Sequence, residues 1–196
     1  MYAESDRPPP VLVEVVERLE EADGLDRPAS LVARAARRVV RPGPVEDALT
    51  GRWLGHAVHP LLTDIPIGFW TSASFLDLVG GREARPAATA LLAAGNLAAL
   101  PTAATGLAEW LETDPEVRRV GVVHAAANAA GLALYTASLV ARLRGRPGWG
   151  TALALGGMGV ATVGGYLGGH LAIARKVGTR HPQLDPPGLI TAVNTA

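Results

Sequence analysis

Four long apolar segments occupy most of the chain after residue 60, and short charged connections separate them. They cover residues 61–79, 86–108, 120–141 and 149–174. Only the first of them contains charged side chains, Asp64 and Asp77. An α-helix needs about 20 residues to cross the apolar core of a bilayer, and these segments lack the alternation of membrane strands. The pattern therefore predicts an all-α protein, a four-helix transmembrane bundle with antiparallel neighbours.

Residues 1–52 are rich in charge and predict two amphipathic helices that precede the bundle. In the first helix, apolar side chains share one face: Leu12, Val15, Val16 and Leu19. In the second, arginines share one face: Arg34, Arg37, Arg38 and Arg41. Such a basic helix either lies on an anionic lipid surface or packs on a partner protein. We expect residues 1–52 to be interfacial helices, 53–178 the transmembrane domain and 179–196 an irregular tail.

The charge balance bears on possible partners. The 196 residues include 18 Lys and Arg, 18 Asp and Glu and no Cys, which gives a formal net charge of +0. Nucleic-acid binding depends on an excess of basic side chains, so the lipid bilayer, and not a nucleic acid, is the expected partner. Without Cys, thiolate metal sites and Cys-ligated iron–sulfur clusters are excluded within this sequence.

The basic residues also predict an orientation in the cell membrane. With four spans, both termini and the middle connection lie on one side, which carries Arg34, Arg37, Arg38, Arg41, Arg52, Arg118, Arg119, Arg175, Lys176 and Arg180. The opposite side carries Arg82, Arg85, Arg142, Arg144 and Arg146. The positive-inside rule therefore favours cytoplasmic termini. Residues 1–30 are acidic and contain proline, so we expect the first span to serve as its own insertion signal.

Histidines and carboxylates gather near one face of the predicted bundle. His124 and His170 each lie five residues inside the charged boundary of their helix, about 7–8 Å at 1.5 Å per residue. Because these two helices are antiparallel, both depths are measured from the same membrane face. Asp64 lies at the start of the first span at that face, and His56 and His59 stand just outside it. Ionisable groups below the membrane surface usually face the bundle interior and mark a function.

This histidine layer predicts a cofactor site. His124 and His170 are suitable axial ligands for haem b, which needs no Cys. Alternatively, the site holds a divalent metal ion, with His59, Asp64, His124 and His170 as its ligands. Such a centre would pass electrons to a protein partner or to a membrane quinone. The alternative is a non-catalytic membrane anchor or scaffold, whose polar layer is an internal hydrogen-bond network.

Two smaller features predict helix contacts. Small residues at a spacing of four, which let helices pack closely, mark the last segment: Gly157, Ala161, Gly165 and Gly169. Asp77, at the opposite end from the histidine layer, is expected to be an interfacial carboxylate near Arg82 or Arg85.

Several motifs together resemble the DUF2231 family of bacterial multi-pass membrane proteins. They are GHAVHPLLTDIPIG at residues 55–68, LPTAATG at 100–106, VHAAAN at 123–128 and GGYLGGH at 164–170. The family pattern is written GHPLHP…DxPIG, and Ala57 departs from it where Pro is usual. Part of the N-terminal segment is similar to actinobacterial members. The resemblance implies a four-helix membrane protein with redox proteins such as Rieske-type or cytochrome-like domains as neighbours, and this sequence carries no Rieske domain of its own.

Overall fold

The computed structural model describes residues 10–178, and this part of the chain is helical with no strand. The all-α prediction is therefore confirmed. Seven α-helices are present in the described part: α1 (Val11–Glu21), α2 (Asp26–Val39), α3 (Pro44–Thr50), α4 (Val58–Val79), α5 (Arg85–Trp110), α6 (Pro115–Leu143) and α7 (Pro147–Gly169). A π-helical turn, His170–Ala174, continues α7. Helix α3 was not expected. The predicted tail, residues 179–196, lies outside the described residues, as does His181.

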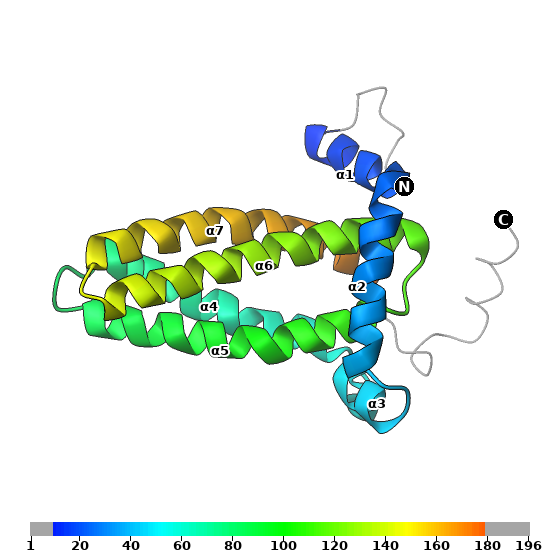
Figure 1. Cartoon of the computed structure of the whole chain (residues 1–196), viewed down its shortest axis with the longest axis horizontal. Helices are drawn as coiled ribbons and strands as arrows, with labels where there is room; N and C mark the ends of the chain where they lie inside the picture. Colours follow the sequence, from blue (N-terminus) through cyan, green and yellow to red (C-terminus); the bar gives the residue numbers. More distant parts are fainter. Residues whose placement is uncertain (1–9, 179–196) are drawn as a thin grey trace, which may run out of the picture.

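The four long helices run side by side as two hairpins, α4–α5 and α6–α7 (Figure 1). Packing is most extensive within each hairpin, whereas the two hairpins touch each other less. Proline occupies the first turn of α5, α6 and α7, where its missing N–H leaves no intrahelical bond unmade. The turns before α5 and α7 contain Gly81 and Gly145 at positive φ, which glycine adopts without strain. The charged connections therefore form short reversals, and α4 and α6 begin at the same end of the bundle.

Three of these helices are long and apolar enough to cross a membrane: Arg85–Trp110, Pro115–Leu143 and Pro147–Ala174, which is α7 with its π-helical turn. In each, only 22–28% of the most apolar window is buried inside the protein, so most of its side chains face outward. A lipid environment suits such outward apolar surfaces. The 22 residues of α4 are long enough, but Asp64 and Asp77 lower its hydropathy. Helix α4, the first of the four expected membrane spans, is thus not among these three.

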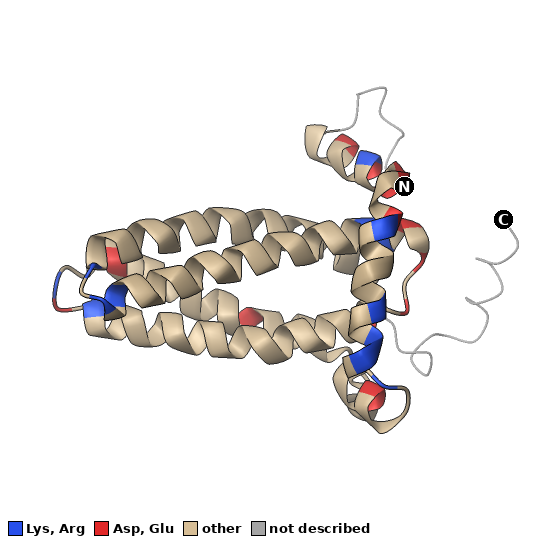
Figure 2. Ribbon diagram, in the orientation of Figure 1, with Lys and Arg blue, Asp and Glu red and all other residues tan. Residues whose placement is uncertain are grey.

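Helices α1, α2 and α3, which we call the collar, lie across one end of the bundle (Figure 1). The face of α2 with Ala29, Ala33 and Ala36 is buried against the ends of α5 and α6. Its arginines are exposed, and Figure 2 shows that charged residues concentrate at the collar and at the opposite tip, with little charge between. In α1 the structure buries Val16, whereas Leu12 and Val15 of the expected apolar face stay exposed.

Candidate functional site

The first candidate side chain, His59, lies in the first turn of α4 and reaches across to α5. Its Nδ1 atom is 2.9 Å from the backbone carbonyl oxygen of Thr102. The ring packs against Gly106, and it does so closely: a Cβ atom at that position would come within 2.7 Å of the ring atom Cε1. The backbone N–H of His59 donates to the Glu109 carboxylate at 3.2 Å. Helix α5 therefore fixes both the backbone and the ring of this histidine.

His124 lies in α6 and makes the same arrangement with α7. Its Nδ1 atom is 2.8 Å from the carbonyl oxygen of Gly164, and the ring lies against Gly168, where a Cβ atom would come within 2.8 Å of Cε1. The Asn128 amide, one turn later on the same helix, is 3.0 Å from Nε2. With the proton on Nδ1 and donated to the carbonyl, Nε2 is the acceptor for the Asn128 N–H.

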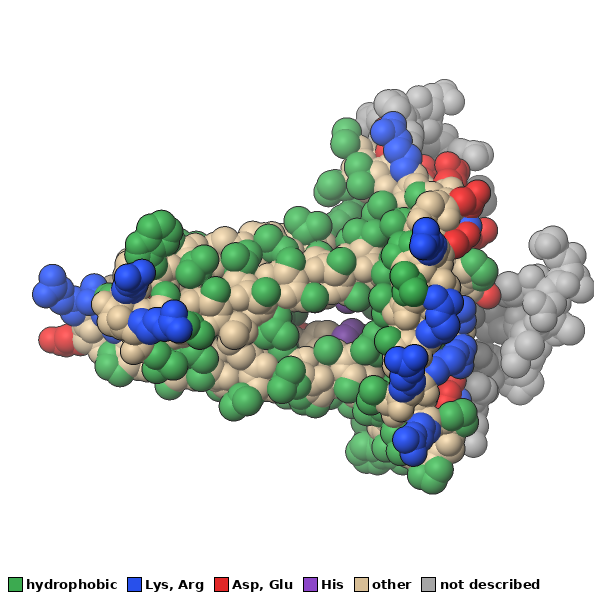
Figure 3. Space-filling view, in the orientation of Figure 1, with side chains coloured by type: hydrophobic (Ala, Val, Ile, Leu, Met, Phe, Trp, Pro, Cys, Tyr) green, Lys and Arg blue, Asp and Glu red, His purple; other side chains and the backbone are tan. Residues whose placement is uncertain are grey.

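These two imidazoles share one chemical state. A histidine whose Nδ1–H donates to a backbone carbonyl keeps the Nε2 lone pair for another partner, and metal-bound histidines are oriented in this way. His59 belongs to the first hairpin and His124 to the second. Figure 3 shows an opening between α5 and α6 in which histidine side chains are visible. Each hairpin thus holds one histidine against its second helix.

His170 points to a different neighbourhood. Its Nε2 atom is 2.9 Å from Oε1 of Glu20, a buried carboxylate of α1. Arg175 holds the same carboxylate, with Nε 2.6 Å from Oε1. This Arg175 hydrogen bond, above all, lowers the pKa of Glu20, and His170 contributes further. Within the described residues no hydrogen bond joins His170 to His124, so their predicted sharing of one ligand stays a prediction.

The remaining predicted ligand, Asp64, is exposed on α4, and no hydrogen bond or ion pair involves it within residues 10–178. His56, which precedes α4, is exposed as well. In the same part of the chain, no group of three or more His, Asp and Glu is arranged to hold a metal ion. The donor set that the geometry offers is therefore the pair of imidazoles.

A buried ion pair lies at the end of the bundle opposite the collar. The expectation that Asp77 lies near Arg82 or Arg85 is wrong, because Asp77 pairs with Arg142 of α6, with Nη1 2.9 Å from Oδ1. The two side chains are only 2% and 4% exposed. Gly150 makes room for Arg142, since a Cβ atom there would come within 2.5 Å of its Cγ. Helix α6 lies diagonally across the bundle from α4, which packs mainly on α5 and α7, so Arg142 reaches Asp77 through the bundle interior.

Small residues of α7 do contact α6 as predicted, but part of the contact lies on a different face of α7. Gly157 packs against the Tyr135 ring, and Gly164 and Gly168 pack against Asn128 and His124. In contrast, nothing lies within 4 Å of a Cβ atom built at Gly165 or Gly169. In this part of α7 the glycines that contact side chains of α6 are therefore Gly164 and Gly168. Each lies one position before a predicted glycine, Gly165 or Gly169.

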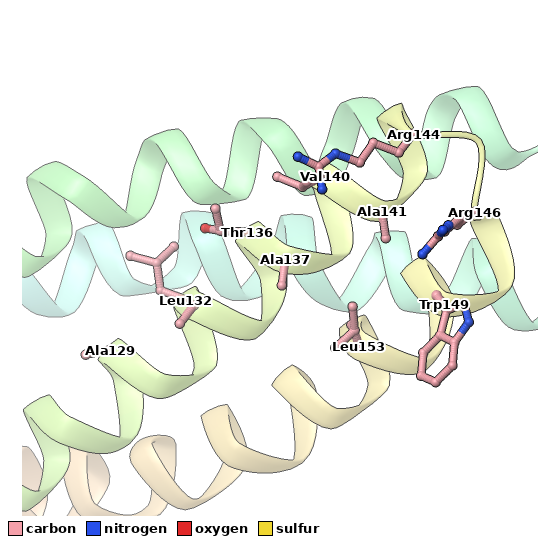
Figure 4. Close-up of a pocket in the computed structure, with 11 residues that line it drawn as sticks. Ala129, Leu132, Thr136, Ala137, Val140, Ala141, Arg144, Arg146, Trp149 and Leu153 are labelled. Atoms are coloured by element: carbon pink, nitrogen blue, oxygen red, sulfur yellow. The ribbon is translucent and has the colours of Figure 1, made fainter.

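Two cavities are found in the described part of the chain, and neither is lined by His59 or His124. An apolar groove of about 770 Å³ lies on the outer surface of α6 and α7 near the opposite tip, between Leu132, Val140 and Trp149 (Figure 4). A polar cavity of about 700 Å³ lies at the collar end, and Glu109 and His56 are among the residues that line it. Glu109, which accepts from the backbone of His59, is thus also part of the wall of this polar cavity.

Comparison with known proteins gives one result. Residues 55–181 match the model of the family DUF2231, described as a predicted membrane protein. No curated protein and no solved structure matches the chain. The matched range begins just before α4 and includes both histidine-bearing hairpins, and the whole collar precedes it.

Proposed function

The chain belongs to the DUF2231 family of predicted membrane proteins, and on this premise we propose that it is a membrane-embedded cofactor protein. In this proposal all four long helices cross the cell membrane, with α4 as the fourth span. The histidine layer binds haem b or a metal ion, and the bound centre passes electrons to a redox protein or to a membrane quinone.

The observation that carries this proposal is the matched state of His59 and His124. Each donates Nδ1–H to a backbone carbonyl of the neighbouring helix, at 2.9 and 2.8 Å. Nε2 of His59 is then a potential ligand atom, and Nε2 of His124 becomes one when the Asn128 amide, 3.0 Å away, is displaced. Helices of the two hairpins hold these rings in place before any ligand binds. Positioned ligands of this kind lower the cost of binding, because their side chains need little reordering.

The donor set favours haem b over a bare ion. The porphyrin supplies four nitrogen ligands and leaves two axial positions, which two imidazoles fill. The opening between α5 and α6 lies beside the histidines and gives a flat macrocycle a lateral entrance (Figure 3). A divalent ion needs further protein ligands, and the other two predicted ones are placed elsewhere: Asp64 is exposed and His170 is bonded to Glu20.

The collar supports an orientation with cytoplasmic termini. The arginines of α2 are exposed and form a basic stripe along the collar end of the bundle (Figure 3). Anionic lipid headgroups of the cytoplasmic leaflet attract such arginines. Exposed apolar residues of α1, Leu12 and Val15, suit burial at the same lipid boundary. The histidine layer then lies near the cytoplasmic face, within reach of a soluble electron-transfer partner.

Absorption spectroscopy and elemental analysis of the detergent-purified protein test this proposal. We expect a Soret band, or a stoichiometric metal, after expression with haem precursor and metal supplements. His59→Ala and His124→Ala should each weaken this signal, while His56→Ala, which changes an exposed histidine, should not. A wild-type protein that stays colourless and metal-free, even after addition of haemin or divalent ions, would contradict the proposal and leave an anchor or scaffold.

A further inference from the structure

The helices α4 and α6 carry matching residues at a constant shift of 65 positions. This shift takes His59 to His124, Trp70 to Tyr135 and Asp77 to Arg142. The threonines that follow the two aromatic residues, Thr71 and Thr136, obey it as well. The matched residues therefore include the histidine, the large aromatic side chain and the buried charge of each helix.

The helices α5 and α7 match in the same way, at a shift of 62 positions. Gly95 lies against the Trp70 ring and Gly157 against the Tyr135 ring. The shift also relates the residues that hold the histidines: the carbonyl of Thr102 corresponds to that of Gly164, and Gly106 corresponds to Gly168. Each hairpin thus repeats the same contacts between its two helices, and not only the same residue types.

Matched residues of the two hairpins meet one another. The rings of Trp70 and Tyr135 stack with centroids 4.3 Å apart, and Asp77 pairs with Arg142. In an object with two-fold symmetry, equivalent residues that contact each other lie at the symmetry axis. Since α4 and α6 begin at the same end, this axis runs along the bundle (Figure 1). Repeats related by an axis along the membrane normal occur in other membrane proteins.

We infer that α4–α5 and α6–α7 are two copies of one hairpin, and that a single haem binds on their pseudo-two-fold axis with His59 and His124 as its two equivalent axial ligands. This inference rests on the proposed function and specifies the ligands of its site. The shift of 62 takes Ala108 to His170, so His170 has no counterpart in the first hairpin and lies outside the repeated site. It instead joins the bundle to α1 through Glu20.

Titration of the purified, full-length protein with haemin tests the inference. We expect one haemin per chain and the absorption spectrum of a six-coordinate, low-spin ferric haem. His59→Ala and His124→Ala should each convert it to a high-spin spectrum, to a similar extent, and added imidazole should restore the low-spin form. The double variant should lose saturable binding. His170→Ala and His56→Ala are matched controls that should retain the wild-type spectrum.

The failures of the inference and of the proposed function are distinguishable. A low-spin haem that is lost in His170→Ala and unchanged in His59→Ala would overturn the paired assignment and leave a haem protein with His124 and His170 as ligands. Absence of haemin binding in the wild type would overturn the inference, and absence of a bound metal ion as well would overturn the proposed function. If an alanine variant does not fold, His59→Gln and His124→Gln retain a hydrogen-bond donor for the carbonyl while removing the imidazole, and retention of the low-spin spectrum in either would overturn the inference.

Discussion

Trp70 of α4 stacks on Tyr135 of α6, with their planes only 15° from parallel and their ring centroids 4.3 Å apart. The contact lies between the histidines at one end of these helices and the Asp77–Arg142 pair at the other. Both aromatic residues are buried, and Tyr135 is 1% exposed. The indole N–H of Trp70 donates to Asn96 of α5 at 3.0 Å, which ties the stack to the first hairpin. The stack therefore joins the two hairpins at the middle of the bundle.

Truncation of this stack should destabilise the bundle. We expect Tyr135→Ala to cost about 3–5 kcal/mol, because it removes a buried aromatic side chain and leaves a cavity. Tyr166→Ala is the matched control, since Tyr166 is 39% exposed and should cost far less in detergent. Thermal unfolding in one detergent compares the two variants, and equal stability losses would show that Tyr135 does not join the hairpins.

The ion pair between Asp77 and Arg142 should behave as a buried pair. Asp77→Asn leaves the Arg142 charge without its partner and should cost about 3–5 kcal/mol. Replacement of both residues by apolar ones of similar size, Asp77→Leu with Arg142→Met, should recover much of that loss. Arg144→Met, at an exposed position of the same connection, is the control. Denaturant unfolding compares these proteins, and a double replacement that costs as much as Asp77→Asn alone would contradict a buried pair.

The glycine beneath the His124 ring should control its orientation. In Gly168→Ala the new Cβ atom would come within 2.8 Å of Cε1 of His124, so the ring must move away from the Gly164 carbonyl. Changes to the groups that orient a ligating histidine typically weaken binding 10- to 100-fold, and we expect a loss of about tenfold or more in haemin affinity. Gly165→Ala has no atom within 4 Å of its Cβ and should bind as the wild type does. Unchanged affinity in Gly168→Ala would argue that His124 is not a ligand.

Docking of α1 should depend on pH through Glu20. The hydrogen bond from Arg175, above all, lowers the pKa of Glu20 in the folded protein. The unfolded state therefore binds the proton more readily, so this contribution to stability is present above about pH 4.3 and is lost as the pH falls through the lower folded value. Hydrogen exchange of residues 11–21, corrected for intrinsic rates, should show loosening of α1 in that acidic window.

A substitution at neutral pH separates this effect from general acid unfolding. Glu20→Gln should loosen α1 already at pH 7, because the neutral amide cannot replace the charged hydrogen bonds to Arg175 and His170. Glu21→Gln changes an exposed neighbour and should leave exchange unaltered. Equal protection of α1 in the two variants would mean that Glu20 does not hold the collar to the bundle.

The sequence was sufficient to predict the helices because their signals are local. Length, low charge and proline at the starts of the segments placed all four long helices within a few residues of their observed bounds. The same signals do not fix how a helix is rotated against a neighbour that is distant in the chain. For this reason Asp77 was assigned to nearby arginines, whereas its partner is Arg142 of another hairpin.

The candidate site was predicted only in part, because the sequence gives the position of a residue along its helix but not the direction in which it faces. Depth along a helix follows from residue counting, so the layer containing His59 and His124 was identified, but depth did not reveal which histidines face each other. The contact of Glu20 with His170 depends on how α1 folds back over the bundle. A sequence signal for the repeat exists: a histidine followed eleven positions later by an aromatic residue and a threonine occurs at both His59 and His124.

Electron paramagnetic resonance of the oxidised, haem-loaded protein tests the central claim most directly, because the spectrum reports the axial ligands of the iron. The account predicts a low-spin ferric signal typical of two imidazoles, and its replacement by a high-spin signal when either His59 or His124 is changed to alanine. A low-spin signal that persists in both of these variants, or a wild-type spectrum without any protein-bound haem, would contradict it.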